Sequence, residues 1–140
     1  MIACIDTNVL PGMFGRAAPL LPLRRALLAG RLDWALSTEI MLEYEEIVAR
    51  EMGAAAVKKV FRFIEIADQT RGVIRHVSPS FRFQLITADP DDDKFADCAI
   101  AADADWIITG DHHFHVLIGS GYKAQPIAPE EFIRRHLGGA

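Results

Sequence analysis

The amino-acid sequence predicts an α/β protein, a three-layer α/β/α sandwich around a central, mainly parallel sheet. Two observations lead to this class. Short apolar runs bounded by turn residues alternate along the chain with longer segments of helical periodicity. That alternation is typical of βαβ units, whose crossovers are right-handed. A length of 140 residues with an apolar fraction of 51% fits one domain, residues 1–140, with a sizeable core.

The first predicted element is a strand that ends on a carboxylate. Residues 1–5 are all apolar, as expected for a buried strand of a parallel sheet, and Asp6 follows directly. In open α/β sheets, functional groups gather at the carboxyl ends of the strands. Asp6 is therefore a candidate catalytic acid, and the other reading of the same residue is a helix N-cap.

The next elements follow from periodicity and capping residues. Pro11 and Gly12 predict a turn. After this turn the sequence predicts helix 17–29, strand 32–36, helix 38–50, helix 54–70 and strand 72–77. Ser37 is the expected N-cap of helix 38–50, and the short link at Gly53 predicts an antiparallel pair of helices. Strand and loop both stay open for segment 81–88, which alternates only weakly.

An acidic turn, residues 89–93, precedes the last predicted elements. These are a helix from 93 or 94 to 102, strand 106–109, a short helix 112–117, strand 124–127 and helix 130–137. Pro129 lies in the first turn of the closing helix, where its missing N–H is tolerated. Strand 106–109 resembles the first strand in that an acid, Asp111, comes soon after it.

Several acids lie where these elements begin or end. Asp6 and Asp111 follow strands, and Glu43 is flanked by apolar residues that predict an inward-facing position. Asp93 and Asp97 are four residues apart and share one helix face. Asp97 stands in an otherwise apolar helix, where a carboxylate needs a partner or a metal ion.

Carboxylates that gather this closely repel one another. At 4 Å each like pair costs on the order of 4 kcal/mol at an effective dielectric near 20. A divalent cation or raised pKa values make such a cluster tolerable, and oxygen-only ligands favour Mg²⁺ or Mn²⁺ over zinc. Sites of this kind activate water and stabilise the charge on a phosphodiester during its hydrolysis.

Composition sets further bounds. The formal net charge of −4 argues against a broad basic surface for nucleic acid, but it leaves a nuclease possible because active-site acids count as negative. No apolar run approaches the ~18 residues of a membrane span, and the N-terminus lacks a basic signal region. We therefore expect a cytoplasmic protein without membrane contact. Cys4 and Cys98 are expected to be buried free thiols.

Motifs spread over nearly the whole chain carry a family resemblance. They are Ile5-Asp6-Thr7-Asn8-Val9-Leu10, Leu36-Ser37-Thr38-Glu39-Ile40, Glu43-Tyr44-Glu45-Glu46-Ile47, Asp89-Pro90-Asp91-Asp92-Asp93-Lys94-Phe95, Asp97 with its alanine-rich helix, Ala104-Asp105-Trp106-Ile107-Ile108-Thr109-Gly110-Asp111, and Pro129-Glu130-Glu131-Phe132. With these motifs the chain resembles the PIN domain family, named after the PilT N-terminus. It is most similar to the VapC-like ribonucleases, the toxins of toxin–antitoxin pairs.

The resemblance implies a Mg²⁺- or Mn²⁺-dependent endoribonuclease that hydrolyses phosphodiester bonds of single-stranded RNA. It also implies a small antitoxin as protein partner and a homodimer. Matched residue by residue, the catalytic and metal-binding acids of the family fall on Asp6, Glu43, Asp97 and Asp111. Small polar positions that line the site fall on Thr7, Asn8 and Thr109, and Asp93 matches a further acid that lies beside the ligands or replaces one of them.

Three other functions fit the sequence less well. A zinc site would need cysteine partners or a helical spacing that are missing around His112, His113 and His115. We therefore expect these histidines to be solvated or to face a phosphate. They also leave the groove for RNA less basic than the family resemblance suggests. A phosphatase of the haloacid dehalogenase type would need an aspartate where this chain has Asn8. The main alternative is a catalytically inactive PIN-like module that binds RNA or a protein. The full set of acids argues against it.

Overall fold

The computed structural model describes residues 1–86 and 89–138. Its five strands form one parallel sheet in the order β3-β2-β1-β4-β5. The strands are β1 (Ile2–Ile5), β2 (Asp33–Leu36), β3 (Ile74–His76), β4 (Trp106–Ile108) and β5 (Gln125–Ile127). The predicted α/β class with a parallel sheet is confirmed. Of segment 81–88, residues 81–86 are loop, and Thr87 and Ala88 lie outside the described residues.

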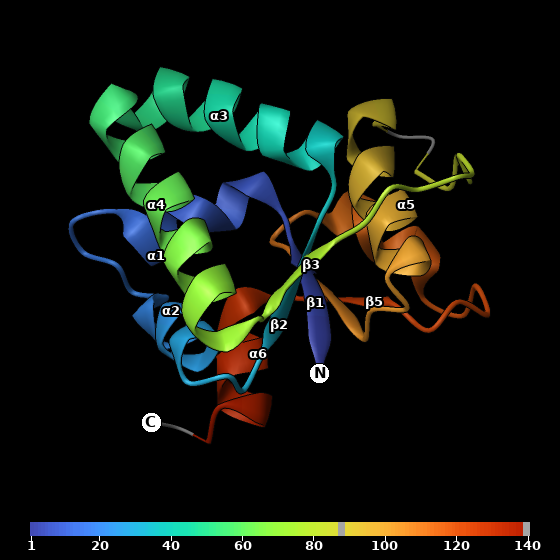
Figure 1. Ribbon diagram of the computed structural model, residues 1–140. Helices are drawn as coiled ribbons and strands as arrows, with labels where there is room; N and C mark the ends of the chain where they lie inside the picture. The colour runs from blue at the N-terminus through green and yellow to red at the C-terminus, as the bar shows by residue number, and fades with distance from the viewer. Residues whose placement is uncertain (87–88, 139–140) are drawn as a thin grey trace.

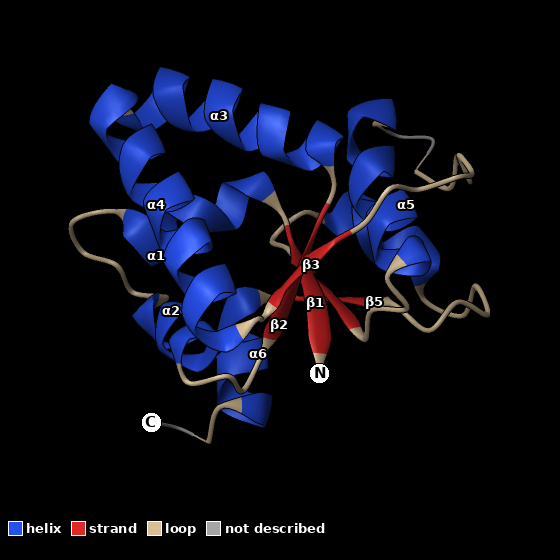
Figure 2. Ribbon diagram, viewed as in Figure 1, coloured by secondary structure: helices blue, strands red, loops and turns tan. Residues whose placement is uncertain are grey.

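Helices cover both faces of the sheet, as expected for a three-layer sandwich. They are α1 (Leu10–Phe14), α2 (Leu21–Leu28), α3 (Thr38–Met52), α4 (Ala54–Arg71), α5 (Asp93–Ala101) and α6 (Pro129–His136). Three 3-10 helices are η1 (Thr7–Val9), η2 (Pro90–Asp92) and η3 (His112–Leu117). Figure 1 shows α1 to α4 on one side of the sheet and α5 on the other, and Figure 2 shows the strands crossing between them.

The structure corrects one predicted turn. Pro11 and Gly12 lie inside α1 instead of forming a turn. Proline fits the first turn of a helix, because that turn needs no N–H from it. A Cβ on Gly12 would lie 2.6 Å from Leu20 Cδ1, so this glycine lets Leu20 pack against the helix. The next helix, predicted from residue 17, begins only at Leu21, because Ala18 has a left-handed φ of 38°.

Tyr44 fixes α3 to the end of β1. The Tyr44 hydroxyl donates a hydrogen bond to the Ile5 carbonyl, and the Trp34 indole N–H donates to the same hydroxyl at 3.3 Å. Tyr44 is fully buried, and burial raises the pKa of its hydroxyl well above the usual range, so it stays a neutral donor. Since Tyr44 follows Glu43 and Ile5 precedes Asp6, this contact brings the two acids to the same edge of the sheet.

Two further predictions concern the cysteines and membrane-spanning helices. Cys4 and Cys98 are both buried and free, as predicted. Within the described ranges, the structure contains no helix with the length and apolarity that a membrane span needs.

Candidate active site

Asp6 lies at the carboxyl end of the central strand. Its backbone N–H donates to the Ile108 carbonyl at 2.9 Å, which continues the pairing of β1 with β4 up to the acid. One carboxylate oxygen accepts the Thr7 N–H at 2.8 Å, and the other accepts the Thr109 hydroxyl at 2.7 Å. Asp6 is therefore the N-cap of η1, and it also sits among other acids. The structure thus confirms the N-cap role of Asp6, and its catalytic role stays a prediction.

Two threonines connect Asp6 with the neighbouring acids. Thr109 Oγ1 accepts the Asp111 N–H at 2.9 Å while its hydroxyl donates to Asp6. The Thr7 hydroxyl donates to Glu43 Oε2. These contacts agree with the expected lining role of Thr7 and Thr109. Asn8, predicted to line the site as well, is exposed on η1.

The electrostatics of Asp6 reflect this arrangement. Asp6 is only 5% exposed, and this burial is the largest influence on its pKa, which it raises. The hydrogen bonds from Thr109 and Thr7 lower this pKa, and the charges of Glu43 and Asp111 raise it. Lys94 Nζ lies 2.7 Å from Glu43 Oε1 and neutralises part of the negative charge. The structure thus brings Asp6, Glu43 and Asp111 together.

Asp92 is a member of this group that the sequence analysis missed. Burial, followed by the charges of Asp6, Asp89 and Asp111, raises the pKa of Asp92 to about 7. Asp92 Oδ2 is buried and accepts no hydrogen bond from any described residue. The sequence signal was present in the acidic run 89–93, but the run alone does not tell which carboxylate faces the strand ends. That orientation depends on η2, the 3-10 turn that precedes α5.

Asp97 has different surroundings from those the sequence predicted. Its Oδ1 accepts the Phe83 N–H at 3.0 Å, and Asp93 Oδ1 accepts the Ile86 N–H at 2.8 Å. Burial raises the pKa of Asp97, the bond from the Phe83 N–H lowers it, and the charges that act on it most strongly are those of Asp93, Arg82 and Glu39. Both acids on this face of α5 hold the loop before it. The need for a partner was inferred correctly for Asp97, but that partner is backbone.

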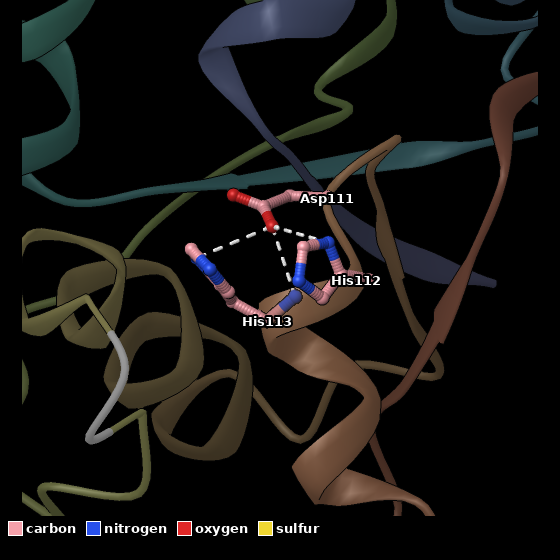
Figure 3. A group of neighbouring side chains, drawn as sticks. All are labelled: Asp111, His112 and His113. Carbon is pink, nitrogen blue, oxygen red and sulfur yellow. Dashed lines mark hydrogen bonds and ion pairs between the residues drawn. The ribbon is translucent and has the colours of Figure 1, made fainter.

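His113 is less solvated than the other two histidines of this segment, and the phosphate-facing role expected as the alternative stays a prediction for it. Its Nδ1 lies 3.3 Å from Asp111 Oδ1 and 3.6 Å from Asp92 Oδ2, and its side chain is 30% exposed. Figure 3 shows the His112 and His113 rings on either side of the Asp111 carboxylate. His112, with a side chain 82% exposed, and His115 are exposed as expected.

The donor set fits a divalent cation. Asp6, Glu43, Asp92 and Asp111 supply carboxylate oxygens, the ligands that hard divalent cations prefer. Two buried atoms, Asp92 Oδ2 and His113 Nδ1, lack a hydrogen-bond partner in the part of the chain that the structure describes. Ligand atoms of Asp89, Asp92 and His113 all lie within 4.8 Å of one another. A cation at this position would satisfy the unpaired atoms and offset the repulsion between the acids.

Fold and site together define an α/β protein with a carboxylate cluster at the carboxyl edge of its parallel sheet. The family model of the PIN domain matches residues 3–113, and the chain belongs to the PIN domain family. PIN domains are in general nucleases. The chain is also similar to a solved structure, VapBC2 from Rickettsia felis bound to a DNA fragment from its promoter. The TM-score is 0.58 at 16% identity, over 91% of this chain and 98% of the other, so this likeness concerns the fold. No curated protein sequence matches the chain.

Proposed function

We propose that this chain is a single-domain, metal-dependent endoribonuclease that hydrolyses phosphodiester bonds of single-stranded RNA. One observation carries the proposal: in a PIN domain, Asp6, Glu43, Asp92 and Asp111 converge at the carboxyl end of the sheet. Sequence matching assigned the third acid to Asp97. The proposal replaces it by Asp92, because the charges of Asp6 and Asp111 raise the pKa of Asp92, whereas Asp97 accepts the Phe83 N–H.

Asp6, Asp92 and Asp111 would hold Mg²⁺ or Mn²⁺, with Glu43 at the edge of the site. A bound ion of this kind supplies Lewis-acid stabilisation of a phosphoryl oxygen and lowers the pKa of a coordinated water. The side chains around it fix the geometry, since Thr109 orients Asp6 and positions the backbone of Asp111.

Lys94 is the cationic group of the chain at this site. It pairs with Glu43, and only 18% of its side chain is exposed. An ammonium group in this position can attract a phosphate of the substrate to the carboxylates. We therefore assign Lys94 a role in substrate binding, a residue that the sequence analysis did not single out.

The similarity to VapBC2 supports the proposal of a small antitoxin as protein partner. We also propose a homodimer. A small reading frame beside that of this chain would support the toxin role, and light scattering that finds a monomer at high micromolar concentration would contradict the homodimer.

Cleavage assays test the proposed activity. Labelled single-stranded RNA, duplex RNA and single-stranded DNA are incubated with the protein and Mg²⁺ or Mn²⁺, or with excess chelator. We expect cleavage of the single-stranded RNA, with metal only, and loss of cleavage in Asp111→Asn. RNA cleavage that continues unchanged in chelator contradicts the metal-dependent mechanism. RNA binding without cleavage under every condition identifies the alternative, an inactive PIN-like binding module.

A further inference from the structure

We propose that His113 supplies a nitrogen ligand to the cation of this site, so that the site prefers a transition-metal ion such as Mn²⁺ over Mg²⁺. The inference rests on the proposed function, because it concerns the cation that the carboxylates would hold. It adds a ligand of a different chemical kind to the acids that the family resemblance implied.

The turn that begins η3 places the His113 ring. Asp111 Oδ1 accepts the His113 N–H at 2.9 Å, so Asp111 is the N-cap of η3, and the chain turns back at this point. The same carboxylate oxygen lies 3.3 Å from His113 Nδ1. Figure 3 shows the His113 ring beside the Asp111 carboxylate. The backbone of His113 is thus held next to a proposed ligand, and its ring lies beside that ligand.

His113 Nδ1 lies at ligand spacing from a carboxylate oxygen on each side. It is 3.3 Å from Asp111 Oδ1 and 3.6 Å from Asp92 Oδ2. Adjacent ligands of an octahedral ion with bonds of about 2.1 Å are roughly 3 Å apart. His113 also belongs to both groups of side chains whose ligand atoms lie within 4.8 Å of one another, one with Asp111 and His112 and one with Asp89 and Asp92. The histidine nitrogen is therefore placed to share a coordination shell with the carboxylate of Asp111 or of Asp92.

Two of these three atoms lack another partner. Within the described residues, His113 Nδ1 and Asp92 Oδ2 are buried and make no hydrogen bond. Buried polar atoms are normally paired, and a coordinated ion would pair both atoms at once. Imidazole nitrogen suits first-row transition metals, whereas Mg²⁺ takes oxygen ligands. The nitrogen therefore makes the site selective, while the carboxylates alone would accept either ion.

Of the neighbouring histidines, His115 provides the matched control. His112 is unsuitable, because its Nδ1 lies 3.9 Å from Asp111 Oδ1 and its ligand atoms form a possible metal group with Asp111 and His113, although its side chain is 82% exposed. His115 is exposed on the same short helix, η3. His115→Gln changes the same residue type in the same element without touching the proposed ligand set, so it separates a loss of coordination from a general effect on η3.

The test measures metal binding without RNA. Calorimetric titration of the metal-free protein with Mn²⁺ and with Mg²⁺ is carried out for the parent, His113→Gln and His115→Gln. We expect His113→Gln to weaken Mn²⁺ binding by about 10-fold or more, a loss of the size found when metal sites lose a supporting group. Mg²⁺ affinity should change much less, and His115→Gln should match the parent. Pulsed electron paramagnetic resonance of the Mn²⁺-loaded parent should show coupling to a directly bound nitrogen, which His113→Gln should lack.

Each contrary result has its own meaning. Mn²⁺ that binds to the parent without nitrogen coupling overturns the role of His113 and leaves the carboxylate site standing. Equal losses of Mn²⁺ and Mg²⁺ affinity in His113→Gln also overturn it, since they would show that the histidine only positions Asp111. A parent protein that binds neither ion overturns both this inference and the metal dependence of the proposed function.

Discussion

The replacement Asp6→Asn tests whether Asp6 belongs to a crowded acid cluster or is only a helix cap. Asparagine caps helices about as well as aspartate, so the bond from the Thr7 N–H should persist. A residue that only caps would therefore tolerate the change. If Asp6 is part of the cluster, the change removes a buried negative charge beside Glu43 and Asp111, and the metal-free protein should become more stable.

The size of the effect follows from the contacts of Asp6. A like charge costs on the order of 2 kcal/mol at a separation of roughly 8 Å and an effective dielectric near 20. The charges of Glu43 and Asp111 both raise the pKa of Asp6, with Glu43 the larger influence, and the ion pair of Glu43 with Lys94 offsets part of the Glu43 charge. Against this gain, the hydrogen bond from Thr109 loses its charged acceptor, a loss of about 1 kcal/mol. The expected net gain is about 1 kcal/mol, or about 4 °C in Tm.

Melting curves with and without metal measure both parts of the prediction. At a free Mn²⁺ concentration 100 times its Kd, the parent should gain about 2.7 kcal/mol, because the ion binds only the folded state. Asp6→Asn should lose most of this gain and its cleavage activity. Glu39→Gln is the control, since Glu39 lies in the first turn of α3, paired with Arg82 and outside the cluster. An Asp6→Asn protein that is destabilised without metal, yet keeps the full metal gain, would remove Asp6 from the site.

Three further predictions concern other parts of the site. Asp92→Asn should abolish most of the stabilisation by Mn²⁺, whereas Asp97→Asn should keep it. Melting curves with and without Mn²⁺ distinguish the two variants, and the opposite pattern would identify Asp97 as the ligand. The pKa of Asp92 is raised from 3.8 to about 7, so between these values the folded protein binds more protons than the unfolded chain. The free energy of unfolding of the metal-free protein should therefore fall as the pH rises through this window, whereas Mn²⁺ affinity should rise and then level off. Urea unfolding measures the first effect and calorimetry the second, each at several pH values. Flat profiles would contradict the assignment of Asp92 to the site. Tyr44→Phe should lower the free energy of unfolding by about 1–2 kcal/mol through loss of its bond to Ile5, as measured by urea denaturation, and an unchanged stability would show that this bond does not hold α3.

The order of strands and helices followed from sequence because each depends on local chemistry. Ser37 caps α3 as predicted, with its Oγ accepting the Ile40 N–H at 3.2 Å, and the parallel sheet follows from alternating apolar runs. The helix at Pro11 and Gly12 was missed because it depends on the packing of Leu20, which lies outside the local pattern.

The part of the candidate site that depends on local sequence patterns could also be predicted. Asp6 and Asp111 were found because strands in a parallel sheet end at one edge, and Glu43 because apolar residues flank it. For the third acid the sequence predicts Asp97, whereas the proposal made above takes Asp92. Burial in an apolar helix shows that a carboxylate needs a partner, but it does not say whether the partner is a metal ion or the Phe83 N–H. The partly buried position of His113 depends on how η3 turns, which no sequence pattern indicated.

We propose that Asp6, Glu43, Asp92 and Asp111 form one cation site at the edge of the sheet. Anomalous diffraction from crystals soaked in Mn²⁺ tests this proposal, because it locates the ion itself. We expect the strongest anomalous peak between the carboxylates of Asp6, Asp92 and Asp111. A strongest peak beside Asp97, or no protein-bound peak at a Mn²⁺ concentration that supports RNA cleavage, would contradict it.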